Sequence, residues 1–238
     1  MRKTFLVAGV AALAFGATGV AQAQAPAPSI DATASVSPSK AGSKKKPKSE
    51  KFKLSVKNDP ASKTTASAIE IKFPKTLKIS TKKLPQCKKS DTALLAGPKK
   101  VCKKSIAGSG SASALLNPFS ATPAPLEFDV TPVVGKNQLL FYLEQKGGAV
   151  KAVLHGKIKG RKMKIEIPGF LQQPAPMTFS ALNELSTTIS FKKKKRGLIT
   201  STGCKGKKHK IGVTVDYVPN PGPPAASSAS DTADAKCK

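Results

Sequence analysis

Apolar and polar residues alternate with a period of two along much of this chain. Phe52, Leu54 and Val56 alternate with lysine and serine, which gives one face of the segment to a core and the other to water. No stretch keeps a helical period. The pattern predicts about ten short strands, and the same alternation or an apolar run recurs in segments 68–73, 77–79, 126–134, 138–145, 149–154, 157–167, 177–182, 187–191, 198–201 and 210–218.

Turn residues separate several of these segments. Gly147-Gly148 divides 138–145 from 149–154, and Gly160-Arg161 lies in the middle of 157–167; both are typical of β-hairpins. Segment 106–116 alternates small apolar residues with glycine or serine, which indicates a strand packed closely against a neighbour. Together the segments predict an all-β fold, an antiparallel β-sandwich of the immunoglobulin-like type, with a barrel as the alternative.

One segment has a different pattern. Residues 91–97 favour one or two helical turns that stop at Gly97-Pro98. Cys87 and Cys102 enclose them. We therefore expect a short helical excursion from the sheet, held by a disulfide.

The start of the chain predicts export. Arg2 and Lys3 precede an apolar run that is too short to span a bilayer, and small residues follow at the spacing of a cleavage site after Ala23. We expect a secreted protein, extracellular or associated with the cell wall. The sequence predicts a signal peptide at 1–23, a flexible Ala/Pro/Lys-rich leader at 24–50, the β-sandwich domain at 51–218 and a Pro/Ala/Ser-rich tail at 219–238.

Charge is the most unusual property of the composition. The chain has 41 Lys and Arg against 13 Asp and Glu. Removal of the predicted signal leaves a net charge of +26 and only two arginines, Arg161 and Arg196. Lysine attracts phosphate or carboxylate as a hydrated point charge, without the forked geometry by which arginine reads base edges. The composition therefore favours diffuse attraction to polyanions.

Four cysteines in an exported chain predict two disulfides, and four cysteines allow three pairings. Pairing Cys87 with Cys102 and Cys204 with Cys237 closes loops of about 16 and about 34 residues, which contributes roughly 3 to 4 kcal/mol each. The second bond would tie the tail back to the domain. A metal or redox site is the alternative, but the sequence has no Cys-x-x-Cys and only two histidines.

Candidates for catalysis are weak. His155 and His209 have no acidic neighbour in sequence, and the lysines around His209 predict a neutral surface side chain. Ser-x-x-Lys occurs at Ser37, Ser43 and Ser80, a spacing that 38 lysines make frequent by chance. No nucleophile elbow, Walker loop or zincin motif is present. We predict no catalytic residue, no metal site and no cofactor.

The best binding candidate is a pair of basic clusters around an apolar run and Cys204. The strand pattern places both clusters at hairpin ends, where a phosphate-rich polymer could bridge them. A solubilising lysine surface that also protects strand edges is the alternative interpretation. The candidate residues are Lys192, Lys193, Lys194, Lys195, Arg196, Lys205, Lys207, Lys208 and Lys210.

Three further stretches carry a resemblance to a known group. They are segment 102–112 after Cys87, segment 139–143 and segment 201–221. In these the chain resembles uncharacterised secreted proteins of high-GC Gram-positive bacteria. The resemblance implies an exported, disulfide-bearing β-domain, and it transfers no catalytic residue because that group has no established activity. One departure is Lys103, where proline would be expected after Cys102.

These observations lead to three hypotheses. The first is a non-enzymatic envelope protein whose lysines bind anionic cell-wall polymers or lipid headgroups. The second is an extracellular nucleic-acid or polyanion binder, disfavoured because the nearest aromatic rings are only Phe191 and Tyr217. The third is a hydrolase of unknown substrate, which would have to depend on the two histidines.

Overall fold

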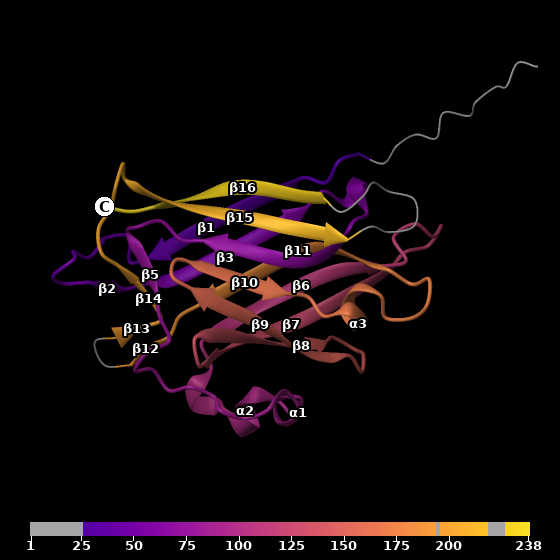
Figure 1. Ribbon diagram of the computed structural model, residues 1–238, viewed down its shortest axis with the longest axis horizontal. Coiled ribbons are helices and arrows are strands. Elements are labelled where there is room, and N and C mark those ends of the chain that lie inside the picture. The colour runs from indigo at the N-terminus through magenta and orange to yellow at the C-terminus, as the bar shows by residue number, and fades with distance from the viewer. Residues whose placement is uncertain (1–25, 194–195, 219–226) are drawn as a thin grey trace, which may run out of the picture.

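The computed structural model describes residues 26–193, 196–218 and 227–238, with the side chains of 192–196 outside this description. The signal peptide predicted at 1–23 also lies outside the described residues. The all-β prediction is confirmed, since most strands pair in antiparallel fashion within one 11-stranded sheet (Figure 1). Its order is β1-β3-β11-β6-β7-β8-β9-β10-β4-β15-β16.

The strands of this sheet are β1 (Ile30–Ser37), β3 (Lys51–Asn58), β4 (Thr65–Lys72), β6 (Gly108–Leu116), β7 (Ala124–Gly135), β8 (Gln138–Gln145), β9 (Lys151–Lys159), β10 (Lys162–Glu166), β11 (Ser180–Ile189), β15 (Lys208–Val218) and β16 (Ser227–Lys236). The short elements are β2 (Lys48–Ser49), β5 (Leu77–Ile79), β12 (Lys192–Lys193), β13 (Arg196–Gly197), β14 (Ile199–Ser201), the helices α1 (Asp91–Leu94), α2 (Pro98–Val101) and α3 (Gly169–Gln172), and two 3₁₀ turns at Pro60–Ser62 and Lys103–Ser105.

The main sheet curls until its two edge strands lie side by side. The backbone N–H of Ala32 in β1 donates a hydrogen bond of 2.8 Å to Oδ2 of Asp231 in β16. Beyond the strands, Lys238 donates to the carbonyl of Ser39 and accepts from the N–H of Ala41. The immunoglobulin-like sandwich needs two separate sheets, whereas these strands form one nearly closed, barrel-like sheet. The barrel alternative is therefore closer to the structure.

Both edge strands correct the predicted domain boundaries. We expected a flexible leader at 24–50, but Ile30–Ser37 pairs along its whole length with β3. We also expected the tail to lie outside the sheet, but Ser227–Lys236 pairs with β15 from Tyr217 to Lys208. Both strands turn small side chains such as Ala32, Ala229 and Ala233 inward. Ile30 and Val36 of β1 are the only larger apolar residues in the two strands, so the alternation that marks a strand in sequence is weak.

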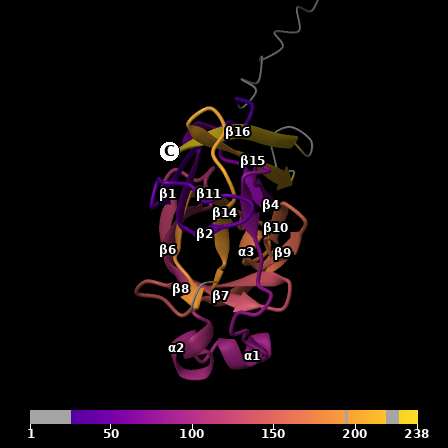
Figure 2. The ribbon, with the colours of Figure 1, turned by 90° about the vertical axis from the view of Figure 1, so that its left-hand side faces the viewer.

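The interior of the curled sheet is the main core. Inward positions on every long strand contribute to it, including Phe52 on β3, Ile71 on β4, Leu139 on β8 and Val213 on β15. At one end of the sheet a small sheet, of order β2-β14-β5, adds Leu77, Ile79 and Ile199 to the same core. Figure 2 views this end and shows β14 and β2 within the outline of the main sheet.

The predicted helical excursion is confirmed, and it covers the outer face of β7, β8 and β9. Leu94 of α1 and the disulfide of Cys87 and Cys102 pack against Leu140 and Tyr142 of β8 in a second buried cluster. Strand β8 is consequently buried on both faces. This explains why its sequence is a continuous apolar run rather than an alternation.

Candidate functional site

The pairing of the strands places each connection between them at one of the two ends of the barrel-like sheet. We name the first the basic end, which consists of segments 38–50, 73–86, 136–137, 160–161, 202–207 and 237–238. We name the second the apolar end, which consists of segments 59–64, 117–123, 146–150 and 167–179.

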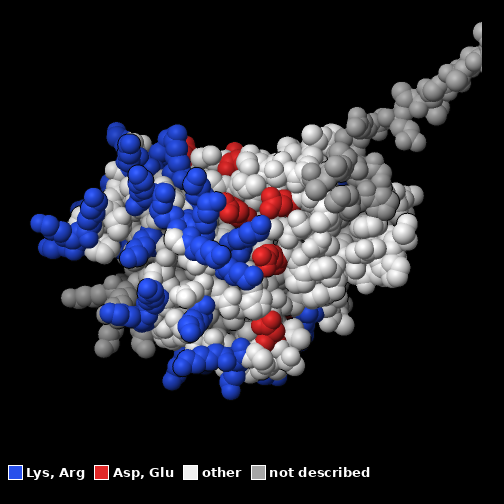
Figure 3. All heavy atoms as spheres, in the orientation of Figure 1, with Lys and Arg blue, Asp and Glu red and all other residues white. Residues whose placement is uncertain are grey.

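Charge is distributed very unevenly between the two ends. The segments of the basic end carry 14 Lys and Arg against one acidic residue, Glu50. Those of the apolar end carry only Lys63, Lys146 and Asp59. Figure 3 shows the consequence on one face of the molecule: the lysines gather on the left, where β2, β5 and β14 lie, and the right is nearly free of charge.

Seven of the 13 acidic residues form ion pairs with lysines, and all seven lie on strands of the main sheet, which forms the wall of the molecule. Cross-strand pairs join Lys157 to Glu166 at 3.0 Å and Lys151 to Glu144 at 3.0 Å. Lys162 and Glu70 lie 2.8 Å apart. The Lys151 ammonium lowers the pKa of Glu144, chiefly through their hydrogen bond. The strands of the main sheet carry 12 lysines against 10 acidic residues, so the wall is close to neutral.

The basic end lacks such neutralisation. Within the part of the chain that the structure describes, none of its 14 basic residues lies within 4.0 Å of a carboxylate oxygen. Lys44, Lys45 and Lys46 are exposed in the segment before β2, and Lys82 and Lys83 are exposed after β5. The sequence separates these two groups by more than 30 residues, and the fold brings both to one end.

The predicted basic clusters are partly included in this surface. Lys205 and Lys207 are exposed in the turn before β15. Lys208 and Lys210 lie on the outer face of β15, where Lys208 forms an ion pair with Asp234. The side chains of Lys192, Lys193, Lys194, Lys195 and Arg196 lie outside the described residues. The lysines of 40–48 and 75–83 were not predicted to share a surface with these clusters, because the segments are far from them and from each other in the chain.

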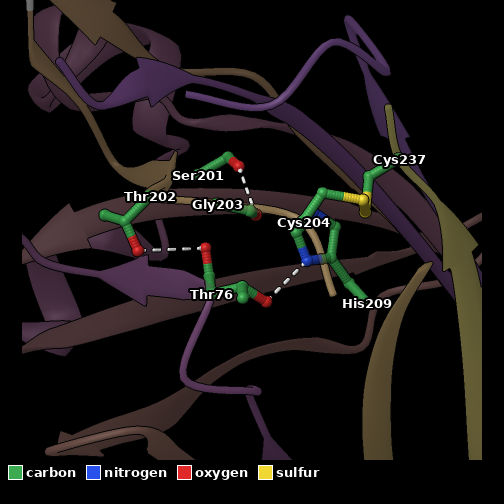
Figure 4. The surroundings of a disulfide bond; sticks show 7 residues. All are labelled: Thr76, Ser201, Thr202, Gly203, Cys204, His209 and Cys237. Carbon is green, nitrogen blue, oxygen red and sulfur yellow. Dashed lines mark hydrogen bonds between the residues drawn. A yellow bond between two sulfur atoms is a disulfide. The ribbon is translucent and has the colours of Figure 1, made fainter. Parts of the chain in front are cut away.

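His209 corrects a second prediction. We expected a surface side chain, but only 1% of His209 is exposed, because the alternation of β15 points it inward with Ile211. Its Nδ1 lies 2.8 Å from Oγ1 of Thr76, whose carbonyl accepts hydrogen bonds from the backbone N–H and the hydroxyl of Thr202 (Figure 4). Burial lowers the pKa of His209, so the imidazole is neutral at physiological pH.

The two disulfides pair as predicted, Cys87 with Cys102 and Cys204 with Cys237. The second lies close to His209 at the basic end (Figure 4) and joins the segment before β15 to the end of β16. The last residues of the chain are thereby held beside Lys205 and Lys207. Disulfides are typical of proteins that fold in an oxidising, extracellular environment.

His155 holds the helical excursion against the sheet. Its Nε2 lies 2.8 Å from Oδ2 of Asp91 in α1, and its Nδ1 lies 3.1 Å from Oε1 of Gln138 in β8. Both ring nitrogens are thus engaged in contacts that join α1, β8 and β9. These contacts give His155 a structural role, which the sequence could not indicate because Asp91 is 64 positions away.

Glu50 is the one acidic group at the basic end, and it is buried. Only 3% of the residue is exposed, and neither carboxylate oxygen has a hydrogen-bond partner among the described residues. Burial raises the pKa of Glu50 to about 7, although the nearby Lys48 acts in the opposite direction. Glu50 was predicted to lie in the flexible leader, but its position two residues before Phe52 puts it on the inward face of that chain segment.

A scan against models of protein families, a search of curated proteins and a search of solved structures each found no match to this chain. The resemblance to secreted proteins of Gram-positive bacteria stays a prediction. Among the described residues, no group of three or more His, Cys, Asp and Glu side chains is placed to hold a metal ion. Nor does any helix in the described ranges have the length and hydropathy needed to cross a membrane.

Proposed function

We propose that this chain is an exported, non-enzymatic protein whose basic end binds phosphate-rich anionic polymers or headgroups of a cell envelope. The observation that carries the proposal is the segregation of charge, with 14 basic residues against the single buried Glu50 at one end. Seven carboxylates on the wall form ion pairs with lysines, whereas the described lysines of the basic end have no carboxylate oxygen within 4.0 Å and are exposed, apart from the half-buried Lys48. Such a surface attracts a polyanion over a Debye length of about 10 Å.

The composition of the basic end favours phosphate over base recognition. Arg161 is the only arginine whose side chain is described. The segments of this end contain one aromatic residue, Phe73, and it is fully buried. The two rings nearest in sequence to the predicted clusters are no better placed, because Tyr217 is buried and Phe191 packs against the core. Nucleic-acid binders that use stacking need exposed rings. The chemistry of the site therefore supports a phosphodiester polymer or a lipid headgroup over a nucleic acid.

The proposal is tested with four ligands at matched salt: poly(glycerol phosphate), vesicles of phosphatidylglycerol, vesicles of phosphatidylcholine and single-stranded DNA. We expect binding to the first two that weakens steeply as salt rises, and none to neutral vesicles. The first two arms distinguish a wall polymer from a lipid headgroup. Tighter binding to DNA than to both would favour the second hypothesis, and salt-insensitive binding would contradict the proposal.

Two variants with equal charge change locate the site. The first replaces Lys44, Lys45, Lys46 and Lys205 of the basic end by Gln. The control replaces the four exposed lysines Lys88, Lys89, Lys99 and Lys100 of the helical excursion by Gln. We expect the first variant to lose at least tenfold in affinity at low salt and the control to lose much less. Equal losses would show that total charge, rather than the basic end, determines binding.

A further inference from the structure

An apolar cavity of about 510 Å³ lies inside the barrel-like sheet. Seven adjacent strands, from β11 through β6, β7, β8, β9 and β10 to β4, line it together with α3. Its volume is in the range of about 300 to 1,000 Å³ that is common for ligand pockets. The small sheet with β14 fills the interior at the basic end, so the cavity belongs to the opposite half of the molecule.

The walls of the cavity are almost entirely hydrocarbon. Phe128, Phe141, Leu154 and Ile165 are buried side chains that line it. The remaining lining residues include only three polar ones, Ser113, Gln145 and Ser180, and no charged one. A polar ligand would lose its hydration in such a site without regaining hydrogen bonds.

Small side chains create the space. Ala112 and Ala114 on β6 and Ala66 on β4 line the cavity at positions where leucine or isoleucine would fill it. Protein interiors are close-packed and contain few voids larger than a water molecule. A space of this size, lined by hydrocarbon, forgoes dispersion contacts that an apolar occupant would supply.

Half-buried and exposed apolar residues mark the side on which the cavity opens. Leu116, Leu171 and Leu182 line it and are only partly buried. Phe170 of α3 is 55% exposed and Val150 of the β8–β9 connection is 40% exposed, and both also line it. Two further exposed apolar residues belong to the apolar end: Phe119 in segment 117–123 is 43% exposed, and Met177 in the same segment as Phe170 is 75% exposed. A cluster of exposed apolar residues at one end of a molecule indicates a contact surface for an apolar ligand.

We propose that this cavity binds a single acyl chain, which enters from the apolar end with its methyl terminus deepest and its headgroup in water near Phe170. The uncharged lining selects a hydrocarbon chain and leaves the headgroup unspecified. This site is separate from the basic end, so the protein has two binding surfaces of opposite chemistry at its two ends.

The direct test is displacement of a fluorescent probe, dansyl-undecanoic acid, from the purified oxidised protein. Saturated fatty acids and the matching primary alcohols serve as competitors. We expect affinity to rise about two- to fourfold for each added methylene until the chain outgrows the cavity. Alcohol and acid should compete similarly, and added salt should leave affinity almost unchanged. Absence of probe binding, or affinity that is independent of chain length, would overturn the proposal.

Substitutions on β6 test whether the ligand binds inside the cavity. Ala112→Leu and Ala114→Leu each reduce the space from within, whereas Ser111→Leu adds the same bulk to an exposed position on the same strand. We expect each alanine variant to weaken probe binding at least tenfold while its melting temperature without ligand stays equal or rises, and Ser111→Leu to bind normally. Unchanged binding in both alanine variants, with a melting curve showing that they fold, would contradict this.

The basic-end variant with four glutamines separates this proposal from the previous one. We expect it to bind acyl chains as the unmodified protein does, even where it no longer binds anionic polymers. A parallel loss of both activities in a folded variant would mean that one surface accounts for both, and would contradict two separate sites.

Discussion

The backbone N–H of Ala32 in β1 and the carboxylate of Asp231 in β16 are 2.8 Å apart, and this hydrogen bond connects the two edge strands of the main sheet. The same carboxylate accepts a hydrogen bond from the N–H of Thr232 through its other oxygen. An unpaired edge strand exposes backbone groups to association with other chains. The contact between residues 199 positions apart therefore protects both edges and holds the sheet closed.

Replacing Asp231 by Ala should lower the free energy of unfolding by about 1 to 2 kcal/mol, because a charged acceptor is lost from a partly buried hydrogen bond. Urea unfolding measures the change, and amide exchange at Ala32 should become faster. Asp234→Ala is the matched control on the same strand, because its ion pair with Lys208 is exposed to water and contributes about 0 to 1 kcal/mol. An equal effect of the two substitutions would contradict a closing role for Asp231.

The two disulfides should stabilise different parts of the molecule. Replacing Cys204 and Cys237 by Ser should cost about 4 kcal/mol, because the bond closes a separation of 33 residues. Faster amide exchange should then appear along β16. The corresponding change at Cys87 and Cys102, 15 residues apart, should cost about 3 kcal/mol and mainly affect α1 and α2. Faster exchange in β16 after the second change, but not after the first, would contradict this assignment.

How far the sequence predicts this structure depends on side-chain size. Segment β3 was predicted because Phe52, Leu54 and Val56 alternate with lysines, and it pairs along its length. Strand β6 was predicted from glycine and serine, and the reason for Gly108 is now clear, since a methyl group there would overlap the backbone carbonyl of Thr188. Strands β1 and β16 were missed because alanine at inward positions gives little hydrophobic contrast.

The candidate site was predictable only in part. The total charge and the cluster at Lys205 and Lys207 follow from the sequence. That Lys44 and Lys82 lie at the same end of the molecule as this cluster depends on the strand register of the nearly closed sheet. The cavity could not be predicted, because its existence depends on strands such as β11 and β4 that are more than 100 positions apart in the chain. Local alternation determines which side chains face inward, but not whether they fill the interior.

Glu50 predicts how stability depends on pH. Its pKa rises from 4.5 to about 7 on folding, so its contribution to stability is fully present below pH 4.5 and is lost as pH rises to about 7. Glu50→Gln should remove this dependence. The variant should become more stable relative to the unmodified protein between pH 5 and 8, by about 1 to 2 kcal/mol after allowance for solvent screening.

Urea unfolding at several pH values measures this difference. His209 contributes equally to the pH dependence of both proteins, so its contribution drops out when their stabilities are compared. A difference that is constant from pH 5 to 8 would contradict the burial of an unpaired carboxylate at Glu50. The control is the same type of substitution at the apolar end, Asp59→Asn, because Asp59 is only partly buried and its carboxylate accepts a hydrogen bond from the N–H of Ala61.

Tyr217 should be resistant to ionisation. Its hydroxyl donates a hydrogen bond of 2.8 Å to Oδ1 of Asn58, and burial raises its pKa well above the usual value. The other tyrosine, Tyr142, also has a raised pKa because of burial. The rise in absorbance at about 295 nm that reports tyrosine ionisation should therefore occur at a higher pH in the folded protein than the value near 10 of a free tyrosine. A titration near pH 10 in the folded state would contradict the burial of these phenols.

Whether the basic end itself contacts the polyanion is tested most directly by hydrogen–deuterium exchange with and without poly(glycerol phosphate) at low salt. We predict slower exchange in segments 38–50, 73–86 and 202–207, which the fold brings to one end from three parts of the chain. Segments 117–123 and 167–179 at the apolar end should exchange at the same rate in both conditions. Protection at the apolar end, or equal protection throughout the molecule, would contradict binding by the basic end.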